Sequence, residues 1–189
     1  AEVKDIAATA KEHGAEVVER PEDIAGDTAA IEDSVRHVVR TLDHIDGWQP
    51  DIILLMQANI LYRPPGLIDE VVQKLAEDDT LDSVATCYEV NQRPEWMKKV
   101  VDGVLVPVSD CSSFRQQELP EYYLLDGAVI AVRREMLMRT EGQRGVHVYM
   151  GKRLGYVVQD RMFGVEVDEP EDVAMAEMAL KYITEKRDK

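Results

Sequence analysis

Apolar and polar residues along this chain repeat with two periods, that of helices and that of buried strands. Apolar residues at helical spacing predict helices over residues 2–13, 31–45, 67–75 and 170–186. Strands are predicted at 51–57, 82–90, 127–132 and 155–160, with shorter ones at 15–19 and 164–168. The segment DIILLMQ, at residues 51–57, is apolar without alternation, as in strands buried on both faces of a parallel sheet. The alternation of helices and strands predicts a three-layer α/β fold with a mostly parallel sheet.

The middle of the chain departs from this alternation. Residues 96–108, WMKKVVDGVLVPV, predict two short strands joined at Asp102-Gly103, a pair that is favoured in hairpin turns. A polar and irregular arm follows at 109–120. We therefore expect residues 1–189 to form one domain with a hairpin and arm insertion at 91–125, an element that could reach a partner subunit and support a dimer.

Charge and cysteine content narrow the possible partners. The formal net charge is −15, from 37 acidic residues against 22 Lys and Arg, which argues against a nucleic acid or an anionic membrane as the main partner. A small anionic ligand, held by local cations or by a metal, remains compatible with this charge. No apolar run approaches the roughly 18 residues that would span a bilayer. Cys87 and Cys111 have neither disulfide-framework nor metal-ligand spacing, which favours a reducing, cytoplasmic location.

The stretch FGVEVDEPEDV concentrates acidic residues near the end of the chain. Glu166 and Asp168 lie two residues apart in a predicted strand, so they point to one face and repel each other unless a cation lies beside them. Mg²⁺ takes oxygen ligands, commonly one or two carboxylates together with substrate phosphates. For Asp168 the alternative is an N-cap of the following helix. The acids in the first turn of that helix need no further function, because acids are favoured there: Glu169, Glu171 and Asp172.

Polar residues also follow the predicted strand at 51–57. Ligands of open α/β sheets bind beyond the carboxyl ends of the strands, and there the chain places Gln57, Asn59 and Arg63 as candidates for binding a substrate. Ordinary hydrogen bonding at the strand end is the alternative for Gln57 and Asn59. Lys99 and Arg115, on the predicted hairpin and arm, are cations that either bind an anionic ligand or face solvent.

Five segments stand in the order GAEVVERPEDIAGDT, DIILLMQANILYRPPGLIDEVV, RPEWMKKV, FRQQELPEYYLLDGAVIAVRREML and GVEVDEPEDVAMAEMAL. In this order they resemble the cytidylyltransferases that activate acidic sugars, which are the CMP-sialate (acylneuraminate) synthetases and, more distantly, the CMP-3-deoxy-manno-octulosonate synthetases. The resemblance spans nearly the whole chain. It implies a Rossmann-like nucleotidyltransferase fold, transfer of CMP from CTP to the sugar acid with release of pyrophosphate, dependence on Mg²⁺, and a homodimer.

The resemblance also implies roles for residues near the strand ends. Glu166 and Asp168 match the family's two metal-binding, catalytic acids, although the family commonly has Asp at the first position. Gln57 matches a glutamine that contacts the sugar. Asn59 stands where the octulosonate enzymes have a metal-binding Asp, and the triplet Ala58-Asn59-Ile60 replaces the Pro-Thr-Ser of sialate members.

Further substrate-binding roles are implied for the middle of the chain. Lys99 matches a sugar-binding lysine, with Lys98 as the alternative after a one-residue shift. Arg115 lies beside the family's carboxylate-binding arginine, whose own position is held by Gln116. Asp126 stands where the family has an asparagine that enters the next strand.

The start of the sequence differs from the family, which begins with a strand and a loop rich in Gly, Arg and Lys that binds the CTP triphosphate. Here an amphipathic helix comes first, so we expect the native chain to be longer; a short helical start is the alternative. The sugar is open between sialate-like and octulosonate-like acids. A nucleotidyltransferase for another sugar, a glycosyltransferase of related fold and a non-catalytic binding protein are the further alternatives.

Overall fold

The computed structural model describes residues 3–26, 29–110 and 115–187. Cys111 and residues 112–114 of the predicted arm therefore lie outside the described residues. The chain forms two compact units, the first comprising Ala1–Ile53 with Arg133–Gly151 and the second Leu54–Val132 with Lys152–Lys189. The single domain expected over residues 1–189 stays a prediction.

The first unit is built from helices. It contains α1 (Val3–Glu12), α2 (Ile31–Asp46) and α4 (Arg134–Arg139), with short 3₁₀ turns η1 (Glu22–Ile24) and η4 (Val148–Met150). Helix α2 ends at Gly47, whose φ of 66° is the left-handed conformation that favours glycine at this position. The strand predicted at 15–19 is wrong, because these residues form no ladder with any described strand.

A buried arginine ties α2 to α4 within this unit. The side chain of Arg36 is 3% exposed, and its guanidinium donates to Leu137 O at 2.8 Å, to Asp33 Oδ1 at 2.7 Å and to Thr140 Oγ1 at 3.2 Å. A buried charge is tolerated only when it is paired and hydrogen-bonded, and these contacts meet that condition. Arg36 therefore fixes the packing of the two helices.

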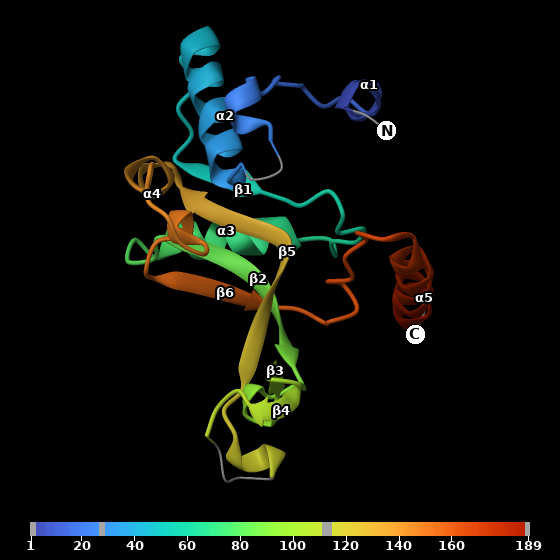
Figure 1. Ribbon diagram of the computed structural model, residues 1–189. Helices are drawn as coiled ribbons and strands as arrows, with labels where there is room; N and C mark the ends of the chain where they lie inside the picture. Colours follow the sequence, from blue (N-terminus) through green and yellow to red (C-terminus); the bar gives the residue numbers. More distant parts are fainter. Residues whose placement is uncertain (1–2, 27–28, 111–114, 188–189) are drawn as a thin grey trace. The chain divides into compact units, whose positions relative to one another are not determined.

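The second unit contains the sheet, with strand order β1-β5-β2-β6. Its strands are β1 (Ile52–Leu55, whose first two residues belong to the first unit), β5 (Tyr122–Arg133), β2 (Ser83–Val90) and β6 (Leu154–Val158). β2 pairs with β6 in parallel and with β5 antiparallel, so the expected α/β fold is confirmed, but the sheet is mixed where a mostly parallel one was expected. Helix α3 (Leu67–Glu77) packs across β2 and β6 with Val71 and Leu75 fully buried (Figure 1).

A hairpin lies at the end of a two-stranded ribbon in this unit. β2 and β5 continue as a pair beyond the last contact with β6, at Cys87, and lead to β3 (Lys98–Val101) and β4 (Val104–Pro107) (Figure 1). Asp102 and Gly103 join β3 to β4 with φ values of 51° and 79°, the positive angles of a type I′ turn. The predicted hairpin is therefore confirmed.

Two predicted elements near the candidate site differ in extent from the structure. β5 begins at Tyr122, five residues before the predicted start at Gly127, because its first half pairs with the outer part of β2. The strand predicted at 164–168 is reduced to a single antiparallel bridge between Ile60 and Glu166. The last helix, α5 (Pro170–Arg187), begins at the predicted proline. Among the described helices, none combines the length and apolar character needed to cross a bilayer.

Candidate functional site

Two segments that carry predicted site residues meet in the second unit. The turn after β1 pairs with residues 166–168 through the Ile60–Glu166 bridge and through Val167 N, which donates to Asn59 O at 3.0 Å. Beside this pairing, Asn59 Nδ2 donates to Asp168 Oδ1 at 2.8 Å. Asn59, Glu166 and Asp168 are thus brought together from positions up to 109 residues apart.

The N-cap alternative for Asp168 can be compared with the contacts at the start of α5. The backbone N–H groups of Asp168 and Glu169 both donate to Asp172 Oδ2, at 3.0 and 2.8 Å. These backbone hydrogen bonds, first that of Glu169 and then that of Asp168, lower the pKa of Asp172. Asp172 therefore accepts the backbone hydrogen bonds seen here, while the carboxylate of Asp168 pairs with Asn59.

The acidic side chains beside this pairing can be compared with the ligands that Mg²⁺ prefers. Glu166 and Asp168 are both exposed, and within the described ranges no group of three or more His, Cys, Asp or Glu side chains is placed to hold a metal. Mg²⁺ dehydrates reluctantly and is usually held by one or two carboxylates, with waters and substrate phosphates completing its shell. Two oxygen-donor side chains fit that pattern and do not fit a site made of protein ligands alone.

An irregularity in β5 lies next to this pairing. Leu125 pairs with Cys87 and Ile130 with Ala85, which leaves residues 126–129 opposite Thr86 alone. The Thr86 hydroxyl donates to Asp126 Oδ1 at 2.5 Å and accepts from Val129 N at 3.0 Å. These side-chain contacts replace backbone ladder bonds that the bulge removes.

Asp126 is enclosed by protein donors at the centre of this bulge. Its carboxylate also accepts from Ala128 N at 2.9 Å and from Gln159 Nε2 at 2.5 Å, and the residue is 1% exposed. The structure therefore supports a positioning role for Asp126 within the bulge, and its contact with a substrate stays a prediction.

The turn that carries Gln57 rests on the same bulge. Gln57 N donates to Gly127 O at 3.2 Å, and Gly127 has a φ of 67°. A Cβ atom at Gly127 would lie 2.6 Å from Gln57 Oε1, so glycine is needed both for the backbone angle and for the approach of the Gln57 amide. The bulge thereby positions the predicted sugar-contacting side chain.

Arg63 clamps this turn to the bulge. Its guanidinium donates to Ala128 O at 2.6 Å, to Gln57 O at 2.6 Å and to Ile60 O at 3.0 Å. Burial lowers the pKa of Arg63, and the negative charge of Asp126 opposes that effect. All three contacts are with backbone carbonyls, so the structure supports a positioning role for Arg63, and its direct contact with a substrate stays a prediction.

The two predicted cations of the hairpin and arm are exposed. Lys99 lies on β3, and Arg115 is 79% exposed with its guanidinium 3.5 Å from Glu118 Oε1. Their roles in binding a sugar stay predictions.

A cavity of about 460 Å³ opens beside Glu166 in the second unit. Its walls come from the end of β2 and the following turn (88–92), from Leu124, from residues 161–162 and 164–166, and from Met175 on α5. Burial raises the pKa of Tyr88 in this wall, the charges of Glu166 and Asp126 add to the effect, and Arg161 opposes it. Sequence reasoning missed Tyr88 and Arg161, and the only available signal for Arg161 was a lone cation directly after a predicted strand.

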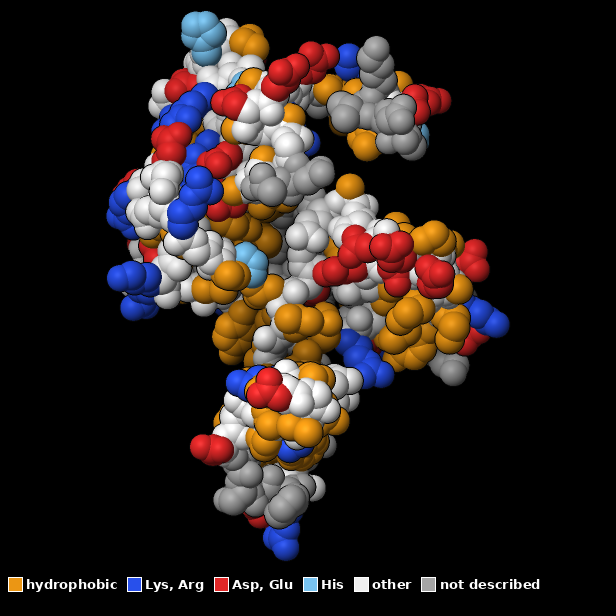
Figure 2. Space-filling view, viewed as in Figure 1, with side chains coloured by type: hydrophobic (Ala, Val, Ile, Leu, Met, Phe, Trp, Pro, Cys, Tyr) orange, Lys and Arg blue, Asp and Glu red, His pale blue; other side chains and the backbone are white. Residues whose placement is uncertain are grey.

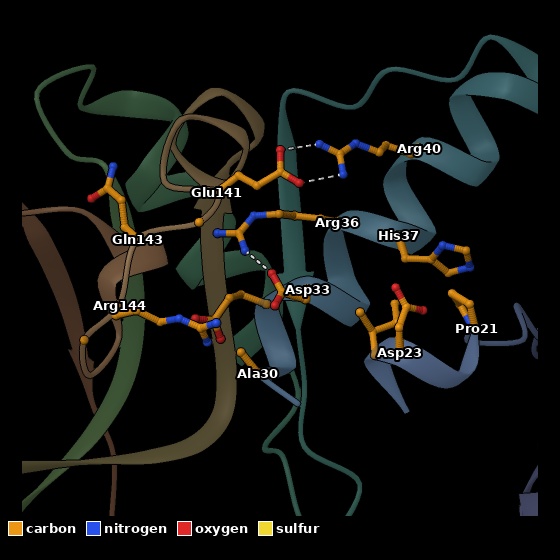
Figure 3. Close-up of a pocket in the computed structure, with 14 residues that line it drawn as sticks. Pro21, Asp23, Ala30, Asp33, Arg36, His37, Arg40, Glu141, Gln143 and Arg144 are labelled. Atoms are coloured by element: carbon orange, nitrogen blue, oxygen red, sulfur yellow. Dashed lines mark hydrogen bonds and ion pairs between the residues drawn. The ribbon is translucent and has the colours of Figure 1, made fainter. Parts of the chain in front are cut away.

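A second cavity, of about 540 Å³, lies in the first unit between α2 and the loop after α4 (Figure 3). None of the predicted site residues lines it. Two of its arginines are paired with acids, Arg40 with Glu141 at 2.8 and 2.5 Å and Arg36 with Asp33 (Figure 3). This cavity therefore holds neither the predicted acids nor the predicted substrate-binding side chains.

Comparisons with known proteins bear on the fold. Neither the protein-family models nor the curated proteins give a match. Among solved structures, the chain is similar to CMP:2-keto-3-deoxy-manno-octonic acid synthetase complexed with CTP, with a TM-score of 0.60 over 94% of this chain and 78% of that chain, at 17% sequence identity. At that identity the likeness shows the fold alone, and the expected nucleotidyltransferase fold is confirmed.

Proposed function

We propose that this protein transfers CMP from CTP to an acidic sugar, with release of pyrophosphate and with dependence on Mg²⁺. The observation that carries the proposal is the meeting of Asn59, Glu166 and Asp168 at a strand end. The fold adds support, because it is shared with a synthetase whose solved structure contains CTP and whose name gives a sugar acid as its substrate.

In this proposal Asp168 and Glu166 hold the magnesium ion. When bound, the ion supplies positive charge that stabilises the phosphate oxygens and lowers the pKa of the attacking hydroxyl. Asn59 donates its amide N–H to Asp168 and so fixes the orientation of that carboxylate. Gln57, held over Gly127, and Asn59 orient the hydroxyl groups of the sugar.

The reaction exchanges one phosphorus–oxygen bond for another. The anomeric hydroxyl of the sugar attacks the α-phosphorus of CTP, the bond to pyrophosphate breaks, and the hydroxyl proton passes to a base. The proton can pass to water, because a bound magnesium ion would lower the pKa of this hydroxyl, and Glu166 lines the cavity wall as one of the two acids that would hold the ion. Lys99 and Arg115 are the cations first expected to bind the sugar carboxylate, while Arg63 and Asp126 position the turn and the bulge.

We also propose that the insertion at 91–125 forms a homodimer through its hairpin. Val100 and Leu105 pair across the hairpin on one face and are each 70% exposed, and apolar side chains gather over the hairpin in Figure 2. Contiguous exposed apolar surface of this kind is typical of an interface. Light scattering should show a dimer that Leu105→Lys converts to monomer. Val146→Lys, at a site 89% exposed outside the hairpin, is the matched control.

The activity is tested with the full-length protein. Pyrophosphate release is measured with CTP, Mg²⁺ and a panel of 2-keto-3-deoxy sugar acids that includes sialic and octulosonic acids. We expect release with one class of sugar acid and none with neutral sugars. Absence of release across the panel, together with no CTP binding in calorimetry, would contradict the proposal and favour a non-catalytic protein.

A further inference from the structure

The cavity beside Glu166 is lined by charged residues, and not all of them have a role in the proposed function. Three of its lining residues are charged: Glu89, Arg161 and Glu166. Glu89 is already paired, because its carboxylate lies 3.1 Å from the guanidinium of Arg93, a side chain that is 4% exposed. Glu166 is assigned to the magnesium ion in the proposed function, so among the described residues of this wall Arg161 is the charged group available to a ligand.

The guanidinium of Arg161 is not engaged by other described residues of the protein. Within the part of the chain that the structure describes, its guanidinium makes no ion pair or hydrogen bond, and the residue is exposed. Its charge nevertheless acts on the cavity wall, since it opposes the rise in the pKa of Tyr88 that Glu166 promotes. Arg161 and Glu166 therefore act on the same side chain of the wall.

The chemistry of the proposed substrate requires such a pair. In the cyclic form of a 2-keto-3-deoxy sugar acid, the carboxylate and the anomeric hydroxyl are bonded to the same carbon atom. The cation that binds the carboxylate must then lie close to the acids that would hold the magnesium ion beside that hydroxyl, and Glu166, one of these acids, lines this cavity. Lys99 and Arg115 do not line this cavity, and Arg115 already lies beside Glu118.

We propose that Arg161 binds the carboxylate of the sugar acid in the cavity beside Glu166, an inference that rests on the proposed function. A guanidinium can donate two parallel hydrogen bonds to a carboxylate, which fixes both the position and the rotation of the sugar. With the carboxylate on Arg161, the anomeric hydroxyl faces Glu166. The amides of Asn91 and Gln92 and the Tyr88 hydroxyl line the remaining wall and are available to the other hydroxyl groups.

The test compares Arg161→Gln and Arg161→Lys with Lys99→Gln and Arg115→Gln. Loss of a charge-assisted bidentate contact should raise the KM for the sugar acid by about 10- to 100-fold in Arg161→Gln, with the KM for CTP unchanged. Arg161→Lys should recover part of the loss, because the charge remains and the two-pronged geometry does not. A merely structural role would instead lower the Tm and affect both substrates.

Direct binding separates this inference from the proposed function. Calorimetry with the sugar acid and with its neutral carboxamide, without CTP, should show a preference for the acid that Arg161→Gln abolishes. If the unmodified protein binds the acid in this way but releases no pyrophosphate, the proposed function fails and the role of Arg161 stands. If Arg161→Gln keeps the preference while Lys99→Gln or Arg115→Gln loses it, the inference is overturned.

Discussion

Replacing Asn59 by Asp would turn the contact with Asp168 into a direct test of the proposed metal site. Asn59 Nδ2 donates to Asp168 Oδ1 at 2.8 Å. The Asn59 amide is uncharged and nearly the same size as an Asp carboxyl group, so it can hydrogen-bond to Asp168 without repelling it. In Asn59→Asp the donor becomes a second carboxylate. The two acids should then repel each other unless a divalent cation lies between them.

The size of the effect follows from the distance and the exposure. Two unit charges about 4 Å apart interact by about 1 kcal/mol in water and about 4 kcal/mol near a protein surface of effective dielectric 20. Asp168 is exposed and Asn59 is half-buried, so the repulsion should lie near the lower figure. With the lost hydrogen bond, worth about 1 kcal/mol, the destabilisation without metal is about 2 kcal/mol. For a chain of this length that corresponds to a fall in Tm of about 4–8 °C.

The assay is thermal unfolding of Asn59→Asp and of the matched variant Asn59→Ala, each in EDTA and across a series of Mg²⁺ concentrations. Asn59→Ala removes the hydrogen bond without adding a charge and keeps Asp168 and Glu166, so it should lose less and respond to Mg²⁺ no more strongly than the unmodified protein does. Asn59→Asp should regain its Tm as Mg²⁺ rises, and at lower concentrations than the unmodified protein needs. Equal losses in the two variants, or a loss that Mg²⁺ does not reverse, would refute the reasoning.

Three further predictions concern the groups that position or surround the site. Arg63→Lys leaves one ammonium to serve three carbonyls, so calorimetry should show a Tm about 4–8 °C lower, from a loss of about 2 kcal/mol, whereas Arg20→Lys, at an exposed arginine bonded to Ser34, should change little. Thr86→Val keeps the side-chain volume but removes the hydroxyl that accepts from Val129 N and donates to Asp126. Chemical denaturation should therefore show that the free energy of unfolding falls by about 3 kcal/mol, and a fall below about 1 kcal/mol would contradict the account of the bulge. Burial raises the pKa of Tyr149 to about 12, so its contribution to stability should be full below pH 10 and should fall as the pH rises toward 12; the measurement is the denaturation midpoint against pH, with Tyr149→Phe lacking that loss.

The sequence was a good guide where local pattern decides structure. The helical stripe from Ile31 to Ile45 became α2, and the Asp102-Gly103 pair became the hairpin turn, because both depend on residues adjacent in the chain. The predicted strand at 15–19 failed because a strand needs a neighbour, and a run of apolar residues does not supply one. Local periodicity carries no information on pairing partners.

The candidate site shows the same limit. Arg63 was a candidate for substrate binding from its position after a strand and Asp126 from the resemblance, and both assignments stay predictions. The contacts that the structure shows for them could not be read from the sequence, because the partners lie up to 65 residues away. The bulge that needs Asp126 is visible only once Thr86 is opposite it. By contrast, Glu166 and Asp168 could be singled out by spacing and by resemblance, and the structure adds the partner, Asn59.

The measurement that tests the central claim most directly is the rate of pyrophosphate release by Asp168→Ala at saturating CTP, sugar acid and Mg²⁺. The matched control is Glu171→Ala, which removes an acid from the first turn of α5. If Asp168 and Glu166 hold the catalytic magnesium, Asp168→Ala should lose activity by at least about 100-fold while the Tm falls by only about 2–4 °C from the lost hydrogen bond with Asn59, since one group that stabilises charge in the transition state is commonly worth that much. The control should retain activity. Full activity in Asp168→Ala under these conditions would contradict the account.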